Sequence, residues 1–145
     1  MTNSHEEVTD SPVKWVADHV QRYVASDGEN GHRWSGQLTL LLTTHGRKTG
    51  LLRRTALIYG EDGDRYIVVG SNSGKEQHPA WYMNLLENPE VQVQVGAKQF
   101  AAQARPATGE ERSRLWELMA GIFPTYKTFQ KKTDREIPVV ILEPD

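Results

Sequence analysis

Most of the β-prone segments in this chain follow one another without an intervening helix. Apolar and β-branched runs predict about six strands, at residues 38–44, 54–59, 65–70, 91–95, 98–104 and 138–142. Asp62-Gly63 is typical of a hairpin turn between the second and third, and Gly96-Ala97 turns the fourth into the fifth. The regular alternation of strand and helix that a doubly wound parallel sheet needs is missing. We therefore expect an α+β fold that is mainly antiparallel, a β-barrel with covering helices.

Three helices are predicted around these strands. The first has Ser11 as its N-cap and Pro12 at its first position, and its apolar stripe comprises Val13, Val16, Val20, Tyr23 and Val24. A turn-rich segment, residues 27–36, follows it. The second spans residues 79–86 and ends at Asn88-Pro89. The third begins after Thr108, whose spacing to Glu111 predicts a capping box, and its apolar face comprises Leu115, Leu118, Met119 and Ile122.

Length and composition limit the class of protein. The 145 residues are expected to form one domain, residues 12–145, after a polar and disordered tail, residues 1–11. A net charge of −2 disfavours general nucleic-acid binding, and the absence of cysteine excludes disulfides and thiolate chemistry. The five histidines are not at metal-ligand spacing, so no metal is expected. A secretory leader and a membrane-length apolar run are both missing, which indicates a cytoplasmic protein.

Two neighbouring segments suit an anionic ligand. One turn and the strand after it carry four cations and no acid: Arg47, Lys48, Arg53 and Arg54. The other is the small-residue loop from Gly70 to Gly74, which ends a strand and precedes the helix at Pro79. Guanidinium and ammonium groups would meet the charge, while exposed backbone N–H groups approach closely. The general alternative is that the cations are solvated surface and the loop is a plain turn.

Few side chains indicate catalysis by the protein alone. G-x-S-x-G is missing and Ser71 has no evident base, which disfavours acyl transfer. His78 is expected to cap its helix or to face solvent. Trp81 and Tyr82 either line a ring-shaped cofactor or belong to the core. Without an acid/base pair, chemistry carried by a bound cofactor is favoured, although G-x-G-x-x-G and Walker A motifs are absent.

An ordered set of motifs resembles the deazaflavin (coenzyme F420)-dependent nitroreductase family of actinobacteria, also described as F420H2-dependent quinone reductases. The matching pieces are Arg53, the D-G hairpin, and the runs L-L-T-T-H-G-R-K-T-G (41–50), V-V-G-S-N-S-G (68–74), H-P-A-W-Y-M-N-L (78–85), N-P-E-V-Q-V-Q (88–94) and T-D-R-E-I-P-V-V (133–140). The resemblance covers about residues 36–144 and implies a split β-barrel. It also implies binding of F420, a deazaflavin with a phosphate and an acidic oligoglutamyl tail.

The resemblance also implies which residues bind the cofactor. The phosphate and tail region would lie on Arg47, Lys48, Thr49 and Arg53. The deazaflavin ring would lie on the strand residues Arg54, Thr55, Ala56, Leu57 and Ile58, on Val69, Gly70, Ser71 and Asn72 of the loop, and on Ala80, Trp81, Tyr82, Met83 and Asn84 of the helix. Tyr126 would close the pocket.

The family reaction is hydride transfer from C5 of the reduced deazaflavin to an acceptor stacked over the ring. Quinones are the favoured acceptors, with activated enones and nitroaromatics as further candidates. We expect Ser71 to hydrogen-bond the acceptor and Tyr126 to place it or to donate a proton. Three tyrosines cover the substrate in the best-known family pattern, whereas this chain keeps Tyr126 and has Phe123 and Phe129 beside it; Ile58 and Asn72 also depart from the pattern.

Other functions remain open at this level. The same pocket could bind F420 without turnover, or the chain could be an FMN-dependent oxidoreductase on the related barrel. The partner is expected to be a small molecule, not nucleic acid, and the chain a monomer or homodimer. The N-terminal apolar stripe either packs on the barrel or attaches the protein loosely to the inner face of the cell membrane.

Overall fold

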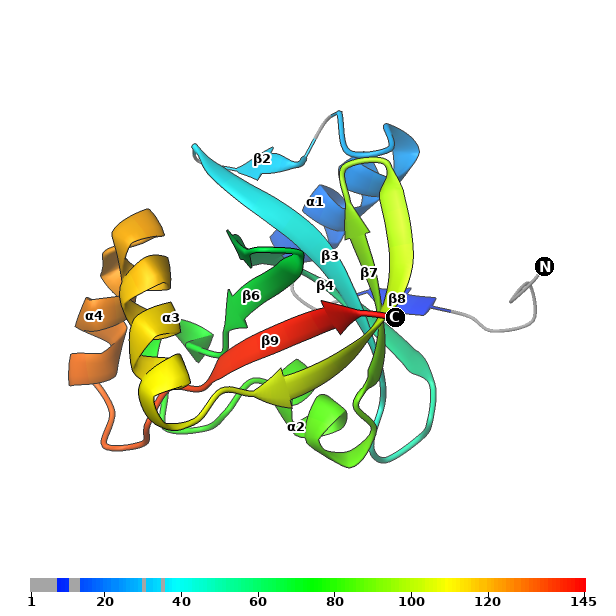
Figure 1. Ribbon diagram of the computed structural model, residues 1–145. Coiled ribbons are helices and arrows are strands. Elements are labelled where there is room, and N and C mark those ends of the chain that lie inside the picture. Colours follow the sequence, from blue (N-terminus) through cyan, green and yellow to red (C-terminus); the bar gives the residue numbers. More distant parts are fainter. Residues whose placement is uncertain (1–7, 11–13, 30, 35) are drawn as a thin grey trace.

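The computed structural model describes residues 8–10, 14–29, 31–34 and 36–145. Its strands are β1 (Val8–Asp10), β2 (Arg33–Trp34), β3 (Gln37–His45), β4 (Leu52–Ile58), β5 (Gly60–Asp62), β6 (Arg65–Val69), β7 (Glu90–Val95), β8 (Lys98–Pro106) and β9 (Val139–Pro144). Its helices are α1 (Lys14–Ala25), the 3-10 turn η2 (Asn72–Gly74), α2 (Ala80–Glu87), α3 (Gly109–Ile122) and α4 (Thr125–Lys131). Figure 1 shows these elements around one curled sheet.

The sheet is antiparallel apart from one short edge pair. Its strand order is β1-β4-β3-β7-β8-β9-β6-β5, with β2 added to β3, and only β1 and β4 run parallel. The sheet curls until β4 and β6 approach each other without pairing, so it forms a barrel that is split between these two strands. The expected antiparallel barrel with covering helices is confirmed.

The hairpin predicted at Asp62-Gly63 is present, but one of its strands was assigned wrongly. It joins β6 to the three-residue strand β5, whereas β4 pairs with β3 from Thr39↔Ile58 to His45↔Leu52. The β3–β4 pair comprises seven residue pairs, whereas the β5–β6 pair comprises only three. Gly60 then lets α3 pack closely, since a Cβ there would lie 2.7 Å from Met119 Sδ.

Two further details differ from the sequence prediction. Val8–Asp10, expected in the disordered tail, form β1; residues 1–7 and the predicted cap at Ser11 and Pro12 lie outside the described residues. Residues 125–131, predicted only as an aromatic and basic segment, form helix α4.

The capping box predicted at the start of α3 is wrong. Thr108 is the N-cap residue but makes no side-chain cap bond. The Glu111 carboxylate instead accepts hydrogen bonds from Arg105 at 3.0 Å and from Arg65 at 3.1 Å. Charge-assisted bonds to two guanidinium groups compete successfully with a bond to a backbone N–H.

The interior of the molecule has two main layers of apolar side chains. Leu40, Leu42, Val68, Val140 and Leu142 fill the curled sheet, together with other side chains of the same cluster. Ile67, Leu115, Met119, Val139 and Ile141 belong to the second layer, which joins the outer side of β6 and β9 to α3 and α4. Figure 1 shows α3 and α4 side by side against this part of the sheet.

Helix α1 packs its apolar stripe against the sheet. Val20 and Tyr23 are fully buried and pack with Leu41, while Val24, at the edge of the predicted stripe, is 37% exposed. The Tyr23 hydroxyl accepts the Gly96 N–H at 2.6 Å and lies 3.0 Å from the Thr39 carbonyl oxygen. One hydroxyl thereby ties α1 to β3 and to the turn between β7 and β8.

We expect Tyr23→Phe to lower the free energy of unfolding by about 1–3 kcal/mol, because it leaves buried backbone groups without their partner. Urea denaturation of both proteins measures this loss. Tyr66→Phe is the matched control, since its hydroxyl bonds no described residue. Equal stability losses in the two variants would contradict this role for the Tyr23 hydroxyl.

Candidate functional site

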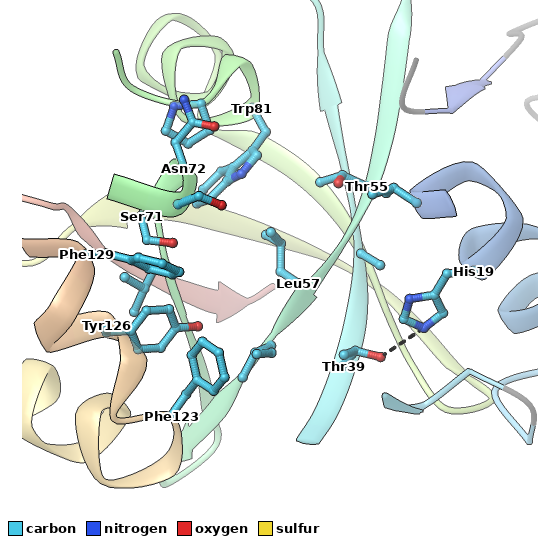
Figure 2. Close-up of a pocket in the computed structure, with 16 residues that line it drawn as sticks. His19, Thr39, Thr55, Leu57, Ser71, Asn72, Trp81, Phe123, Tyr126 and Phe129 are labelled. Atoms are coloured by element: carbon cyan, nitrogen blue, oxygen red, sulfur yellow. Dashed lines mark hydrogen bonds between the residues drawn. The ribbon is translucent and has the colours of Figure 1, made fainter. Parts of the chain in front are cut away.

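A pocket of about 420 Å³ lies where the barrel is split. Figure 2 shows its walls, which come from α1, β3, β4, the loop after β6, α2 and the helical segment around α4. The residues that line it are Val16, His19, Thr39, Thr55, Ala56, Leu57, Ile58, Val69, Ser71, Asn72, Ser73, Pro79, Trp81, Phe123, Tyr126 and Phe129.

The strand segment Thr55–Ile58 contributes a free backbone edge to this pocket. On one side it pairs with β3, from Thr39↔Ile58 to Leu42↔Thr55. On the other side, β1 pairs only with Leu52–Arg54, and no strand of the described chain continues along residues 55–58. Peptide N–H and C=O groups on such an edge can hydrogen-bond a planar molecule that has donors and acceptors along its rim.

Aromatic side chains form the wall opposite β4. Phe123 follows α3, and Tyr126 and Phe129 belong to α4 (Figure 2). Tyr126 is 4% exposed, and its hydroxyl bonds no described residue. Burial raises the pKa of Tyr126, so the hydroxyl stays protonated and can donate a hydrogen bond into the pocket. An apolar wall with one free donor suits a flat molecule that carries a carbonyl oxygen.

Helix α2 connects the pocket to the cationic turn. Trp81 lines the pocket, whereas Tyr82 is 8% exposed and packs in the core. The core alternative is therefore confirmed for Tyr82, and contact of Trp81 with a cofactor stays a prediction. One turn further, Asn84 Oδ1 accepts the Arg47 backbone N–H at 3.1 Å and Arg47 Nη1 at 3.2 Å. Asn84 Nδ2 donates to Thr44 Oγ1 at 3.1 Å. This buried amide therefore holds the turn in place.

The cationic turn presents positive charge that the described protein does not neutralise. Lys48 and Arg53 are exposed, and their side chains have no hydrogen bond or ion pair with a described residue. The turn itself is closed by Gly46 N–H donating to Leu51 O at 2.8 Å and by Gly50 N–H donating to Gly46 O at 2.7 Å. Arg53 is two residues before the pocket residue Thr55 on β4, and Lys48 lies in the turn before that strand.

The loop after β6 has an unusual backbone at the pocket wall. Asn72 (φ 46°) and Ser73 (φ 56°) both adopt left-handed conformations that cost side-chain-bearing residues free energy. The Asn72 side chain donates to Gln77 O at 2.9 Å. The Arg135 guanidinium donates to the carbonyls of Gly70, Ser71 and Lys75. Strained backbone that is held by several bonds is typical of functional sites.

His78 has a different role from the two that were predicted. Pro79 is the N-cap residue of α2, and His78 is half-buried, with Nδ1 accepting a hydrogen bond from Arg135 Nη1 at 3.1 Å. Burial, and then the charge of Arg135, lower the pKa of His78. Its ring is therefore neutral at pH 7, since a protonated Nδ1 could not accept this bond.

The far end of the pocket is polar. His19 Nε2 lies 2.6 Å from the Gly31 carbonyl oxygen and 3.5 Å from Thr39 Oγ1, and Figure 2 shows this pair across the pocket from the aromatic wall. The sequence analysis missed His19, Thr39, Val16, Ser73 and Pro79. The available signal was His19 itself, a polar residue within the apolar stripe of α1.

The predicted site residues fall into three groups. Lining the pocket are Thr55, Ala56, Leu57, Ile58, Val69, Ser71, Asn72, Trp81 and Tyr126. Outside the lining, on the turn and the start of β4, are Arg47, Lys48, Thr49, Arg53 and Arg54. Also outside the lining, on the loop and α2, are Gly70, Ala80, Tyr82, Met83 and Asn84. Gly70 and Asn84 act there through hydrogen bonds that position other residues.

The described residues offer neither a metal site nor a membrane-spanning helix. Among them, no group of three or more His, Cys, Asp or Glu side chains could hold a metal ion. Within the same part of the chain, no helix is long and apolar enough to cross a membrane.

Comparisons with known proteins agree on one family. The profile of the F420H(2)-dependent quinone reductases matches residues 15–144. An F420H(2)-dependent quinone reductase of Mycobacterium tuberculosis is 40% identical over 134 residues, 90% of each chain. The structure of an F420-H2 dependent reductase matches with a TM-score of 0.68 and 42% identity, over 72% of this chain and 93% of that one. A structure described as a domain-swapped dimer matches with a TM-score of 0.72 and 38% identity, over 92% and 100%.

The bond from Arg135 to His78 predicts a pH-dependent stability. The folded pKa of His78 is below its ordinary value of 6.5, so as pH falls below 6.5 the unfolded chain takes up a proton that the folded chain does not. Stability contributed by neutral His78 is therefore present above pH 6.5 and is lost as the pH falls. In urea denaturation between about pH 5 and 7, the free energy of unfolding should fall less steeply with decreasing pH for His78→Asn than for the wild type.

His32 contributes a similar loss of stability at low pH in both proteins, because burial also lowers the pKa of His32. The comparison therefore depends on the difference between the two curves. Parallel curves would mean that His78 is as easily protonated in the fold as in the unfolded chain.

Proposed function

Because this chain belongs to the F420H(2)-dependent quinone reductase family, we propose that it uses reduced F420 to reduce a quinone. The observation that supports this best is the position of the pocket. It lies between the free edge of β4 and an aromatic wall, and the turn and first residues of the same strand carry exposed cations. A planar ring with an acidic tail matches all three features.

The residues present fit the cofactor. The deazaflavin ring would lie against Thr55–Ile58, whose free peptide groups can bond the rim of the ring, with Trp81 at its side. The phosphate and the acidic tail would lie along the turn, on Lys48, Arg53 and Arg47. Charge-assisted bonds of this kind are each worth roughly 1.5–3 kcal/mol.

When bound, reduced F420 supplies the hydride. The protein supplies placement: the acceptor would stack between the ring and the wall formed by Phe123, Tyr126 and Phe129, which also excludes water. Ser71 and Tyr126 would donate hydrogen bonds to an acceptor oxygen. Because burial raises the pKa of Tyr126, its hydroxyl is better suited to holding an oxygen than to releasing a proton.

The favoured acceptor is a quinone, since the pocket wall is apolar apart from its few donors. Phe123 and Phe129 provide less hydrogen bonding than tyrosines would, which makes polar nitroaromatics poorer candidates. The domain-swapped dimer among the similar structures supports a homodimer. The buried stripe of α1 supports at most a loose contact with the cytoplasmic face of the membrane.

Absorbance of reduced F420 with menadione, a simple quinone, tests the proposal. Oxidation that depends on both protein and menadione is the expected result. Binding of F420 without oxidation would make this protein a binding module instead. Binding of FMN in preference to F420 would assign it to flavin-dependent enzymes on the related barrel.

Replacing Lys48 and Arg53 with alanine should weaken F420 binding by about tenfold or more per site, because each replacement removes a cation from the proposed tail site. The loss should shrink at high salt, where exposed charges are already screened. Equilibrium titration of F420 fluorescence measures it. Lys98→Ala with Lys127→Ala removes the same charge from two residues that do not line the pocket and serves as control; unchanged affinity in the Lys48/Arg53 variant would exclude the assignment.

Tyr126→Phe should leave F420 affinity nearly intact and lower turnover with menadione, since it removes only a hydroxyl that faces the acceptor space. Steady-state rates at saturating F420H2 measure this loss, which we expect to be on the order of tenfold. Equal turnover would mean that the Tyr126 ring only packs in the pocket wall and that its hydroxyl has no role in the reaction. Phe123→Tyr with Phe129→Tyr should raise turnover of nitroaromatic acceptors.

A further inference from the structure

Arg135 makes four hydrogen bonds to the wall of the pocket. Nη2 donates to Ser71 O at 2.7 Å, and Nε donates to Lys75 O at 2.8 Å. Nη1 lies 3.2 Å from Gly70 O and 3.1 Å from His78 Nδ1. One guanidinium group, which does not itself line the pocket, thus binds the whole loop from residue 70 to residue 75.

These bonds determine which way two peptide groups face. In a planar trans peptide, the N–H points opposite to the C=O of the preceding residue. The carbonyls of Gly70 and Ser71 both point to Arg135, so the N–H groups of Ser71 and Asn72 point away from it. Neither N–H has an acceptor among the described residues, and both residues line the pocket.

The loop would not hold this conformation unaided. Asn72 and Ser73 are both left-handed, which is unfavourable for residues with a side chain. Gly74 follows with φ 79° and packs so closely on α4 that a Cβ would lie 2.9 Å from Phe129 O. The loop is therefore confined between the aromatic wall on one side and the Arg135 guanidinium on another.

Arg135 is itself fixed to α4. Gln130 Nε2 donates to Arg135 O at 2.8 Å, and Gln130 Oε1 accepts the Ile137 N–H at 2.9 Å. This side chain bridges α4 to the segment that carries the guanidinium. The aromatic wall, Arg135 and the loop thus form one connected unit.

We propose that Arg135 is a positioning residue, which turns the N–H groups of Ser71 and Asn72 into the pocket as a donor pair for a carbonyl oxygen. This inference rests on the proposed function for the source of that oxygen: either the ring of the bound cofactor or the acceptor. Two adjacent N–H groups, together with the Ser71 hydroxyl, can bind one oxygen and polarise its carbonyl.

Arg135→Lys tests the proposal, because a lysine keeps the charge but cannot bond three carbonyls in the geometry of a fork. Arg112→Lys is the matched control: Arg112 Nη2 also donates to a backbone carbonyl, that of Ile137 at 2.6 Å, but it does not contact the loop. Hydrogen exchange of the Gly74 and Lys75 amides, which donate to Ser71 O and Asn72 O, reports the loop directly.

Exchange at these two amides should be about tenfold faster in Arg135→Lys and change by less than about threefold in Arg112→Lys. The kcat/KM for menadione should fall by about tenfold or more in Arg135→Lys alone. A raised Kd for F420 would assign the bonded oxygen to the cofactor, whereas a raised KM for menadione with unchanged Kd would assign it to the acceptor.

Exchange and kcat/KM within about twofold of the wild type would overturn the proposal, as would equal changes in Arg112→Lys. If Arg135→Lys does not fold, Gln130→Ala replaces it, because Gln130 fixes the segment that carries Arg135. Smaller changes in exchange and in kcat/KM are then expected, and values equal to those of the wild type would again overturn the proposal. A wild-type protein that oxidises no F420H2 refutes the proposed function instead, and the exchange measurement does not depend on that activity.

Discussion

Along Thr55–Ile58, strand β4 pairs with a described strand on one side only, and the site depends on this gap. If β6 were paired there, the barrel would be closed and its interior filled with side chains. Instead β6 pairs with β9 and β5, and β1 stops opposite Arg54. An open strand edge is normally a hazard for aggregation, and here α1, α2 and α4 surround it. The same gap therefore provides the binding pocket and accounts for the helices that cover it.

The pocket walls are rigid because polar side chains join elements that are distant in sequence. Asn84 bonds the turn that carries Arg47, and Arg135 bonds the loop at Gly70 and Ser71. Asn84 is buried and Arg135 is half-buried, and a hydrogen bond that is shielded from water holds geometry best. A site held in this way needs little reorganisation when a ligand enters, and the entropic cost of binding is correspondingly lower.

Sequence reasoning succeeded where the signal is local. The alternation of Val91, Val93 and Val95 predicted strand β7, in which Val91 and Val93 are buried. It failed where two distant segments compete. The partner of β4 could not be read from a hairpin turn, and Trp81 and Tyr82 have similar side chains but opposite environments. The roles of Asn84 and Arg135 depend on contacts across 37 and 64 residues, which no local pattern reveals.

Charge is distributed in two sets that serve different purposes. Asp62, Glu111 and Glu143 are paired with Arg65, Arg105 and Arg114 across β5, β6, α3, β8 and β9. These bonds lower the pKa of Asp62 and Glu111 and hold α3 against the sheet. The side chains of Lys48 and Arg53, in contrast, bond no described residue. A chain with a net charge of −2 can thus still attract an anion, because these two cations have no partner among the described residues, whereas Asp62, Glu111 and Glu143 are paired on other elements. Losing those cations removes no ion pair among the described residues, so ligand affinity can change there while the fold is left intact.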